Sequence, residues 1–328
     1  MNRTDARKIP PTRFQRRLLQ WFAGNQRRLP WRARGKQKPH PYRVWVSEIM
    51  LQQTRVAAVM DYFRRFLKQY PTVKSLADAE ETTVLAAWSG LGYYRRARML
   101  HAAARKIVQE RGGRYPQDAA GWRELPGIGR YTAAAIASIC FNEPLAVVDG
   151  NVERVLRRLH GVDEDTALDV WGEAQRLVSP KRPGTFNQAM MELGATVCLP
   201  KKPLCGVCPV YGRCMTRGEH KTSSHEERRK VATNLALTRK NGKVYLVQRA
   251  KNSRLMAGMW ELPQGDGSGT EIMRVKHSIT TTDYSVGVRQ QVGASRVNSG
   301  RWVSRSEFAK VPLTGLTRKI LRKLELLG

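Results

Sequence analysis

The spacing of apolar residues changes once along the chain, and this change constrains the fold more than any other feature. Over residues 12–228, segments such as RFQRRLLQWF, EIMLQQTRVAAVMDYFRRFL and VERVLRRL place apolar residues at positions i, i+3 and i+4, which predicts helices. Beyond them, LALTRK and KVYLVQRA alternate as strands do, and Asn241-Gly242 between them favours a tight hairpin. We therefore expect a multi-domain protein, with an all-α domain at 12–228 and an α+β domain at 232–328.

The chain is strongly basic. Its 58 Lys and Arg residues against 27 Asp and Glu give a formal net charge of +31. Up to Arg228 the balance is 39 against 21, and after it 19 against 6, so both predicted domains are basic. A surplus of this size is expected of a protein that meets a polyanion, and nucleic acid is the predicted partner. The alternative is a generally basic surface, because composition does not place the charges on one face.

No segment of the sequence predicts a membrane protein. The N-terminal stretch MNRTDARKIPPTRFQRRLL has no apolar core of the kind found in signal peptides, and no uninterrupted apolar run is long enough to span a bilayer. We expect a cytoplasmic monomer that associates with the nucleoid through DNA. The stretch GEHKTSSHEERRKVAT at 218–233 is polar and without periodicity, so we expect an interdomain linker there.

Four of the five cysteines fall in one short segment with the spacing C-x6-C-x2-C-x5-C. In a cytosolic chain such a group indicates a bound metal rather than disulfides. Four thiolates suit a cubane iron-sulfur cluster, and although a structural zinc uses the same ligands, the single C-x2-C pair favours the cluster. The fifth cysteine, Cys140, lies in the apolar run AAAIASIC and is expected to be a small core residue. The predicted ligands are Cys198, Cys205, Cys208 and Cys214.

A second motif is LPGIGRY, which ends at Tyr131 and predicts a glycine-rich turn that opens a helix. Gly127 and Gly129 let the backbone approach a partner closely, and the N–H groups of the helix N-terminus can bind an anion. Taken alone, the motif is also compatible with an ordinary interhelical turn. Asp149, twenty residues after Gly129, follows an apolar segment and precedes a helix, a position where Asp is most often an N-cap.

In this order, the glycine-rich hairpin, the Asp and the four-cysteine segment resemble the helix-hairpin-helix DNA glycosylase superfamily, over roughly Arg27 to Arg213. Within that superfamily, WVSEIMLQQT around Glu48 is similar to the motif of the MutY-type adenine glycosylases, whose glutamate is the catalytic acid. Enzymes of the endonuclease III type carry a lysine where this chain has Tyr131, and that lysine permits strand cleavage. The resemblance therefore implies a monofunctional glycosylase with a 4Fe-4S cluster.

The implied reaction is hydrolysis of the N-glycosidic bond of an adenine flipped out of double-stranded DNA, where it is mispaired with 8-oxoguanine or guanine. Burial would keep Glu48 protonated so that it can donate to the base, while Asp149 would stabilise the sugar cation, with Tyr131 and Asn151 assisting this pair. By the same resemblance, the residues that meet DNA around the adenine are Gln53 as a wedge, Tyr93 as an inserted aromatic, and Arg27 and Arg32 around the flipped base and its phosphate.

The C-terminal region resembles the Nudix-like domain with which these enzymes recognise 8-oxoguanine. Its supporting features are GMWELP, the strand pattern and the terminal WVSRSEF. No hydrolase box of clustered glutamates follows, so we expect no pyrophosphate hydrolysis. The family's Phe-Ser-His recognition motif is replaced by VKHSIT, and we expect His277 or Ser278 to read the lesion, with a plain surface role as the alternative.

Three other functions compete with this one. A bifunctional lyase for oxidised pyrimidines is disfavoured by Tyr131 and by the second domain. A thymine-mismatch glycosylase would share the hairpin tyrosine but lack the second domain. A non-catalytic, redox-sensing DNA-binding protein would have no need for both Glu48 and Asp149.

Overall fold

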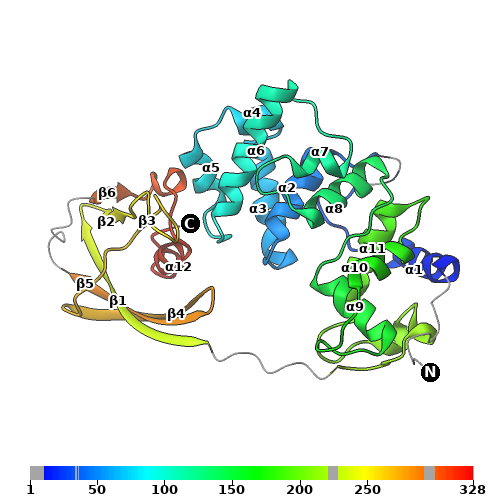
Figure 1. The fold of residues 1–328 in the computed structure, drawn as a ribbon. Helices are drawn as coiled ribbons and strands as arrows, with labels where there is room; N and C mark the ends of the chain where they lie inside the picture. The colour runs from blue at the N-terminus through cyan, green and yellow to red at the C-terminus, as the bar shows by residue number, and fades with distance from the viewer. Residues whose placement is uncertain (1–10, 34, 36, 221–227, 292–299, 328) are drawn as a thin grey trace. The chain divides into compact units, whose positions relative to one another are not determined.

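The computed structural model describes residues 11–33, 35, 37–220, 228–291 and 300–327 (Figure 1). Among them helices come first and strands follow, as the change in apolar spacing predicts. None of the described helices is long and apolar enough to cross a membrane. The first elements are α1 (Pro11–Asn25), α2 (Pro41–Leu51), α3 (Val56–Gln69), α4 (Val73–Ala77), α5 (Glu81–Trp88), α6 (Arg95–Arg111), α7 (Ala119–Arg123), α8 (Arg130–Phe141), α9 (Gly150–His160), α10 (Val170–Leu177), α11 (Pro183–Thr196), and the 3₁₀ turns η2 (Cys205–Val207) and η3 (Tyr211–Arg213).

The C-terminal region forms a mixed sheet of six strands within the described residues. Its elements are β1 (Arg229–Lys240), β2 (Lys243–Gln248), β3 (Trp260–Glu261), β4 (Thr270–Ile279), β5 (Thr282–Gln291), β6 (Gly300–Ser304), the 3₁₀ turn η4 (Phe308–Lys310) and α12 (Gly315–Lys323). The strand order is β3-β2-β1-β5-β4, and β6 pairs with β2. Because β1 is parallel to β5 and antiparallel to β2, it joins the two parts of the sheet (Figure 1).

The predicted hairpin is confirmed. β1 and β2 are joined by Asn241 and Gly242, whose φ angles of 50° and 71° are both left-handed, as a type I′ turn requires. The predicted linker is partly wrong, because β1 begins at Arg229 and its long parallel pairing with β5 makes residues 229–233 a strand. Residues 221–227 of the expected linker lie outside the described residues.

Helix α12 closes the C-terminal region. Its residues Ile320 and Leu321 are fully buried in an apolar cluster that also contains Val286 of β5. Burial of these side chains is the main stabilising contribution to the sheet and helix together. The expected α+β character is confirmed, whereas a Nudix-like identity and the boundaries 12–228 and 232–328 stay predictions.

The helical run EIMLQQTRVAAVMDYFRRFL is interrupted in its middle. α2 ends at Leu51 and α3 begins at Val56. Between them Gln53 has a φ of 54°, in the left-handed region that a residue with a side chain adopts only at a conformational cost. The interruption places Gln53 on an exposed turn instead of on a helix face.

The chain divides into two compact units that are discontinuous in sequence. The first comprises Met1–Gln52 and Gln109–Ser224, and the second comprises Gln53–Val108 and His225–Gly328. Helices α3 to α6 therefore belong with the C-terminal sheet. In the first unit, α1, α9, α10 and α11 pack around a separate apolar cluster.

Asn187 on α11 forms hydrogen bonds with two other segments of the first unit. Its Oδ1 accepts from the N–H of Val147 (3.2 Å), and its Nδ2 donates to the carbonyl of Leu145 (2.8 Å) and to Oγ of Ser138 (2.9 Å). The side chain is 2% exposed, so it replaces water as the partner of these backbone groups. Asn187 thereby holds the extended segment that leads directly to Asp149.

Asn187→Ala should lower the free energy of unfolding by about 1 to 3 kcal/mol, because it leaves buried backbone groups of Leu145 and Val147 without partners. Thermal unfolding followed by circular dichroism measures the loss. Asn25→Ala is the matched control, because Asn25 is exposed and makes one bond to the carbonyl of Trp21. Equal melting temperatures for the two variants would contradict this role for Asn187.

Candidate active site

The first unit contains a buried glutamate. Glu48 is on α2, which is apolar on nearly every side, and is only 6% exposed. Tyr131, the second residue of α8, donates its hydroxyl to Oε2 of Glu48 at 3.0 Å. The bond crosses from α2 to α8, so the packing of these two helices positions the pair.

Burial is the main influence on this carboxyl and raises the pKa of Glu48 to about 7. The hydrogen bond from Tyr131 opposes this shift, the negative charge of Asp149 adds to it, and the positive charge of Arg32 opposes it. Near neutral pH, a large share of Glu48 is therefore the neutral acid. A carboxyl with such a pKa can donate a proton to a bound molecule.

Tyr131 has two acceptors for its hydroxyl, Glu48 and the sulfur of Met191 at 3.3 Å. Burial, followed by the charges of Glu48 and Asp149, raises the pKa of Tyr131 well above 10, so the hydroxyl keeps its proton. Cys140, also on α8, is partly buried, and burial together with the charge of Glu48 raises the pKa of its thiol to about 12. It stays a protonated thiol beside the site.

Asp149 is the N-cap of α9. Its Oδ1 accepts from the N–H of Val152 (2.8 Å), and its Oδ2 accepts from Nδ2 of Asn151 (3.0 Å). The expectation that an Asp here is an N-cap is confirmed. Its charge also raises the pKa of Glu48, so the cap lies within electrostatic range of the buried acid.

Arg154 was not identified from the sequence. Its Nη2 donates to Oδ1 of Asn151 (2.8 Å) and to the carbonyl of Gly194 (2.7 Å), and its Nε donates to the carbonyl of Cys198 (2.9 Å). The guanidinium therefore fixes Asn151, which in turn contacts Asp149. An arginine one turn after the N-cap was the available signal.

Glu192 was also not identified from the sequence. A carboxyl within the apolar segment TFNQAMMELGATV indicates that its charge has a partner. It is fully buried on α11 and binds Arg27 (Nε to Oε1, 2.8 Å) and Arg32 (Nη2 to Oε2, 2.8 Å). Burial alone would raise its pKa, but the hydrogen bonds from both arginines lower the pKa of Glu192 to about 2. The structure thus brings Arg27 and Arg32 together, and their contact with adenine or phosphate stays a prediction.

The glycine-rich hairpin precedes α8 as expected. Gly127 has a φ of 76° and needs to be glycine for that reason, whereas Gly129, at −92°, does not. No side chain in the described part of the chain caps α8 at Gly129, which leaves the first N–H groups of the helix open to an anion. Binding of DNA at Gly127 and Gly129 stays a prediction.

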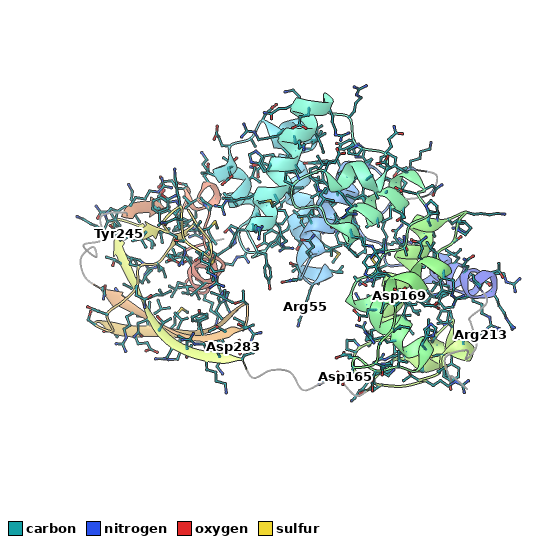
Figure 2. The ribbon with its side chains drawn as sticks, in the orientation of Figure 1. Arg55, Asp165, Asp169, Arg213, Tyr245 and Asp283 are labelled. Carbon is teal, nitrogen blue, oxygen red and sulfur yellow. The ribbon has the colours of Figure 1, made fainter. Side chains whose placement is uncertain are left out.

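Gln53 and Tyr93 belong to the second unit, whereas Glu48 and Asp149 belong to the first. Both are exposed, and Tyr93 shares the left-handed backbone of Gln53 with a φ of 46°. Arg96 stacks over the Tyr93 ring at 5.3 Å and donates to the turn of Gln53 through Oγ1 of Thr54 (3.2 Å). Each turn therefore presents one exposed residue with a strained backbone. In the turn that carries Gln53, Arg55 projects from the start of α3 (Figure 2).

His277 and Ser278 are adjacent on β4 and point to opposite faces. Ser278 is exposed and donates to Oδ1 of Asp283 (2.6 Å), which Figure 2 labels on the sheet. His277 is partly buried, and burial together with the charge of Lys319 lowers its pKa. The two residues cannot read one ligand from the same face of β4.

The cysteine segment offers the donors that an iron-sulfur cluster needs. Burial is the main influence on Cys205 and raises the pKa of its thiol, and the charges of Cys214 and Cys198 add to this shift. Arg158 donates to Sγ of Cys198 (3.4 Å), and the backbone N–H of Arg217 donates to Sγ of Cys214 (3.4 Å). Such N–H to sulfur bonds stabilise cluster-bound thiolates.

Within the described residues, no three His, Cys, Asp or Glu side chains are arranged to hold a single metal ion. Four exposed apolar side chains lie in or directly after this segment: Leu204, Val207, Tyr211 and Met215.

Cys205→Ser should yield little soluble protein and remove the broad visible absorption of the cluster, because cluster binding and local folding are linked. Iron and sulfide content with the absorption spectrum measure the loss. Cys140→Ser, outside the segment, should keep the colour. A colourless wild type with bound zinc would contradict the cluster.

Comparisons with known proteins agree with this geometry. Residues 46–180 match the HhH-GPD superfamily of base excision DNA repair proteins, and residues 198–214 match the iron-sulfur binding domain of endonuclease III. The chain is 51% identical to the adenine DNA glycosylase of Rattus norvegicus over 213 residues, which cover 62% of this chain and 41% of the relative. It is 40% identical to that of Arabidopsis thaliana over 298 residues, covering 75% and 46%.

A solved structure, a thermostable thymine-DNA glycosylase, has a TM-score of 0.57 at 27% identity and covers 63% of this chain and 96% of that one. The helical fold of this superfamily is therefore confirmed, and residues 198–214 form an iron-sulfur binding segment. The chain spans less than half the length of the two relatives described.

Proposed function

We propose that this chain, which carries a MutY-type helix-hairpin-helix glycosylase domain, is an enzyme that releases adenine from mispaired double-stranded DNA by hydrolysis of the N-glycosidic bond. The buried acid Glu48, with a pKa near 7 and with Asp149 in electrostatic range, carries the proposal. Relatives at 40 to 51% identity that are named adenine DNA glycosylases support it.

In this reaction Glu48 donates its proton to a ring nitrogen of the flipped adenine, which makes the base a better leaving group. Asp149, already an acceptor of two N–H bonds, places negative charge beside the sugar cation that forms as the bond breaks. Asn151 orients Asp149 by donating a hydrogen bond to it. The Tyr131 hydroxyl donates a hydrogen bond to the Glu48 carboxylate that remains after proton transfer. Bound by its four cysteines, a 4Fe-4S cluster supplies local folding energy.

We further propose a monofunctional enzyme. A glycosylase that also cleaves the strand needs an amine to attack the sugar. Tyr131 occupies that hairpin position, and its pKa, raised by burial and by the charges of Glu48 and Asp149, keeps it a neutral phenol. The expected product is therefore an intact strand with a missing base.

Glu48→Gln should retain mismatch binding but release adenine orders of magnitude more slowly in single-turnover assays, because an amide has no proton to donate. In the wild type the acid form of Glu48 is lost as pH rises through about 7, so the rate should fall above that pH. The residual rate of Glu48→Gln should lack this limb. A wild type that releases thymine from a thymine–guanine mispair and no adenine would favour the competing thymine glycosylase.

The preference for 8-oxoguanine opposite the adenine is proposed for the exposed face of β4. The Ser278 hydroxyl donates to Asp283, so its lone pairs are left to accept. Guanine presents N7 as an acceptor, whereas 8-oxoguanine carries a hydrogen there and becomes a donor. An acceptor at this position therefore favours the oxidised base, which supports Ser278 over His277 as the reader.

Ser278→Ala should weaken binding to the 8-oxoguanine duplex selectively, by roughly 1 to 3 kcal/mol. Lys276→Ala is the matched control, because Lys276 is exposed two residues away on the same face of β4. Loss of its charge should weaken binding to both duplexes alike and reduce the salt dependence. Binding titrations at two salt concentrations measure both effects, and equal losses for Ser278→Ala on the two duplexes would remove Ser278 as a reader.

A further inference from the structure

The turn that carries Tyr93 is held by side chains. Gly90, Gly92 and Tyr93 all have left-handed backbones, with φ angles of 105°, 71° and 46°. A turn of this kind makes few regular backbone hydrogen bonds, so other donors must satisfy its carbonyls. Nε1 of Trp88 (3.2 Å) and Nη2 of Arg96 (3.3 Å) both donate to the carbonyl of Gly92.

The two residues that flank this turn reach one atom of the C-terminal region. Ser89 donates its hydroxyl to the carbonyl oxygen of Leu313 at 2.7 Å, and Tyr94 donates to the same oxygen at 3.0 Å. The Tyr94 oxygen also accepts from the N–H of Gly90 at 3.3 Å. Both ends of the turn that presents Tyr93 are thus tied to a single carbonyl.

That carbonyl lies beside β3 of the C-terminal sheet. The N–H of Trp260 on β3 donates to the carbonyl of Pro312 (2.8 Å), and the N–H of Thr314 donates back to the carbonyl of Trp260 (2.9 Å). Leu313 is fully buried between these two bonds. The strand β3 lies in the same sheet as β4, which carries the proposed reader of the partner base.

Two further contacts join the same elements. Arg98 on α6 donates to the carbonyl of Ala257 at 2.6 Å. At Gly90, an added Cβ would collide with the hydroxyl of Tyr62 on α3 and come within 3.2 Å of Cδ of Arg318 on α12. The turn therefore lies close to both α3 and α12. The helices α3, α5 and α6 and the C-terminal region belong to one compact unit.

We propose that Ser89 and Tyr94 are positioning residues that hold Tyr93 in register with the C-terminal sheet through the Leu313 carbonyl. The aromatic that stacks beside the mispair and the sheet that reads the partner base then move as one body. This inference rests on the proposed function. It adds a structural link through which recognition of the partner base by the C-terminal sheet affects the position of Tyr93 in the helical part.

The chemistry of the link suits this role. Ser89 and Tyr94 are 1% and 4% exposed, so water does not readily replace either donor. Burial raises the pKa of Tyr94, which keeps its hydroxyl protonated and able to donate. Removal of one hydroxyl leaves the other on the Leu313 carbonyl, so single variants loosen the turn without leaving a buried carbonyl unpaired.

The test uses the full-length protein with its cluster. Single-turnover adenine release is measured for Ser89→Ala and Tyr94→Phe on duplexes with 8-oxoguanine or guanine opposite the adenine. The ratio of the two rates should fall roughly threefold to tenfold, as expected for one lost buried hydrogen bond. Tyr70→Phe is the matched control, because Tyr70 is equally buried and its hydroxyl bonds to Thr83 and Gln69 of the helical part.

A double-mutant cycle with Tyr93→Ala separates positioning from general stability. If Ser89 and Tyr94 act through Tyr93, their substitutions should have little further effect on the rate ratio once that ring is gone. Effects that add fully to Tyr93→Ala, or a ratio unchanged in both single variants, would overturn the proposal. A wild type that releases no adenine from either duplex would instead contradict the proposed function.

A binding measurement covers variants with low activity. 2-Aminopurine placed next to the mispair reports stacking of Tyr93 through fluorescence quenching, and it needs no turnover. Ser89→Ala and Tyr94→Phe should quench less than the wild type at saturating protein, while Tyr70→Phe quenches normally. Quenching equal to the wild type in both single variants would show that Tyr93 is placed without the Leu313 link.

Discussion

The burial of one carboxyl group, that of Glu48, is the constraint on which the candidate site depends. Its helix is apolar on nearly all sides, and transfer of a charged carboxylate into such surroundings is costly, so the neutral acid is favoured. Glu192 is at least as well buried but has a pKa of about 2, because two guanidinium groups bind it. Two buried carboxyls in one unit therefore differ in protonation mainly through their partners, and of the two it is Glu48 that holds a proton to give up.

In the proposed function, Asp149 combines a structural and a chemical role in one position. As an N-cap it stabilises the start of α9, and the same hydrogen bonds orient its carboxylate. Asn151 and Arg154 extend this arrangement along α9 to the backbone of Cys198, the first cysteine of the iron-sulfur binding segment. The folding of that segment and the orientation of Asp149 thus depend on a common helix.

The two compact units divide the proposed tasks. Glu48, Tyr131 and Asp149 lie in the first unit together with the cysteine segment, whereas Tyr93 and Ser278 lie in the second. This division separates bond cleavage from recognition of the partner base. The carbonyl of Leu313 is one link between the helices in the middle of the chain and the region at its end, since two buried hydroxyls bond to it from the helical side.

Local pattern in the sequence was enough for the helices, the hairpin at Asn241 and Gly242 and the cysteine segment, whereas Glu48 and Asp149 were singled out by the resemblance to a family motif. Such patterns report relations between residues a few positions apart. The pairing of Arg27 with Glu192 and of Ser89 with Leu313 spans 165 and 224 residues, and only the packing of whole elements brings such groups together. The same reason explains the misjudged start of β1, which is set by its parallel partner β5. Strand alternation places His277 and Ser278 on opposite faces, but which of the two faces is exposed was likewise undecided until β4 had defined neighbours.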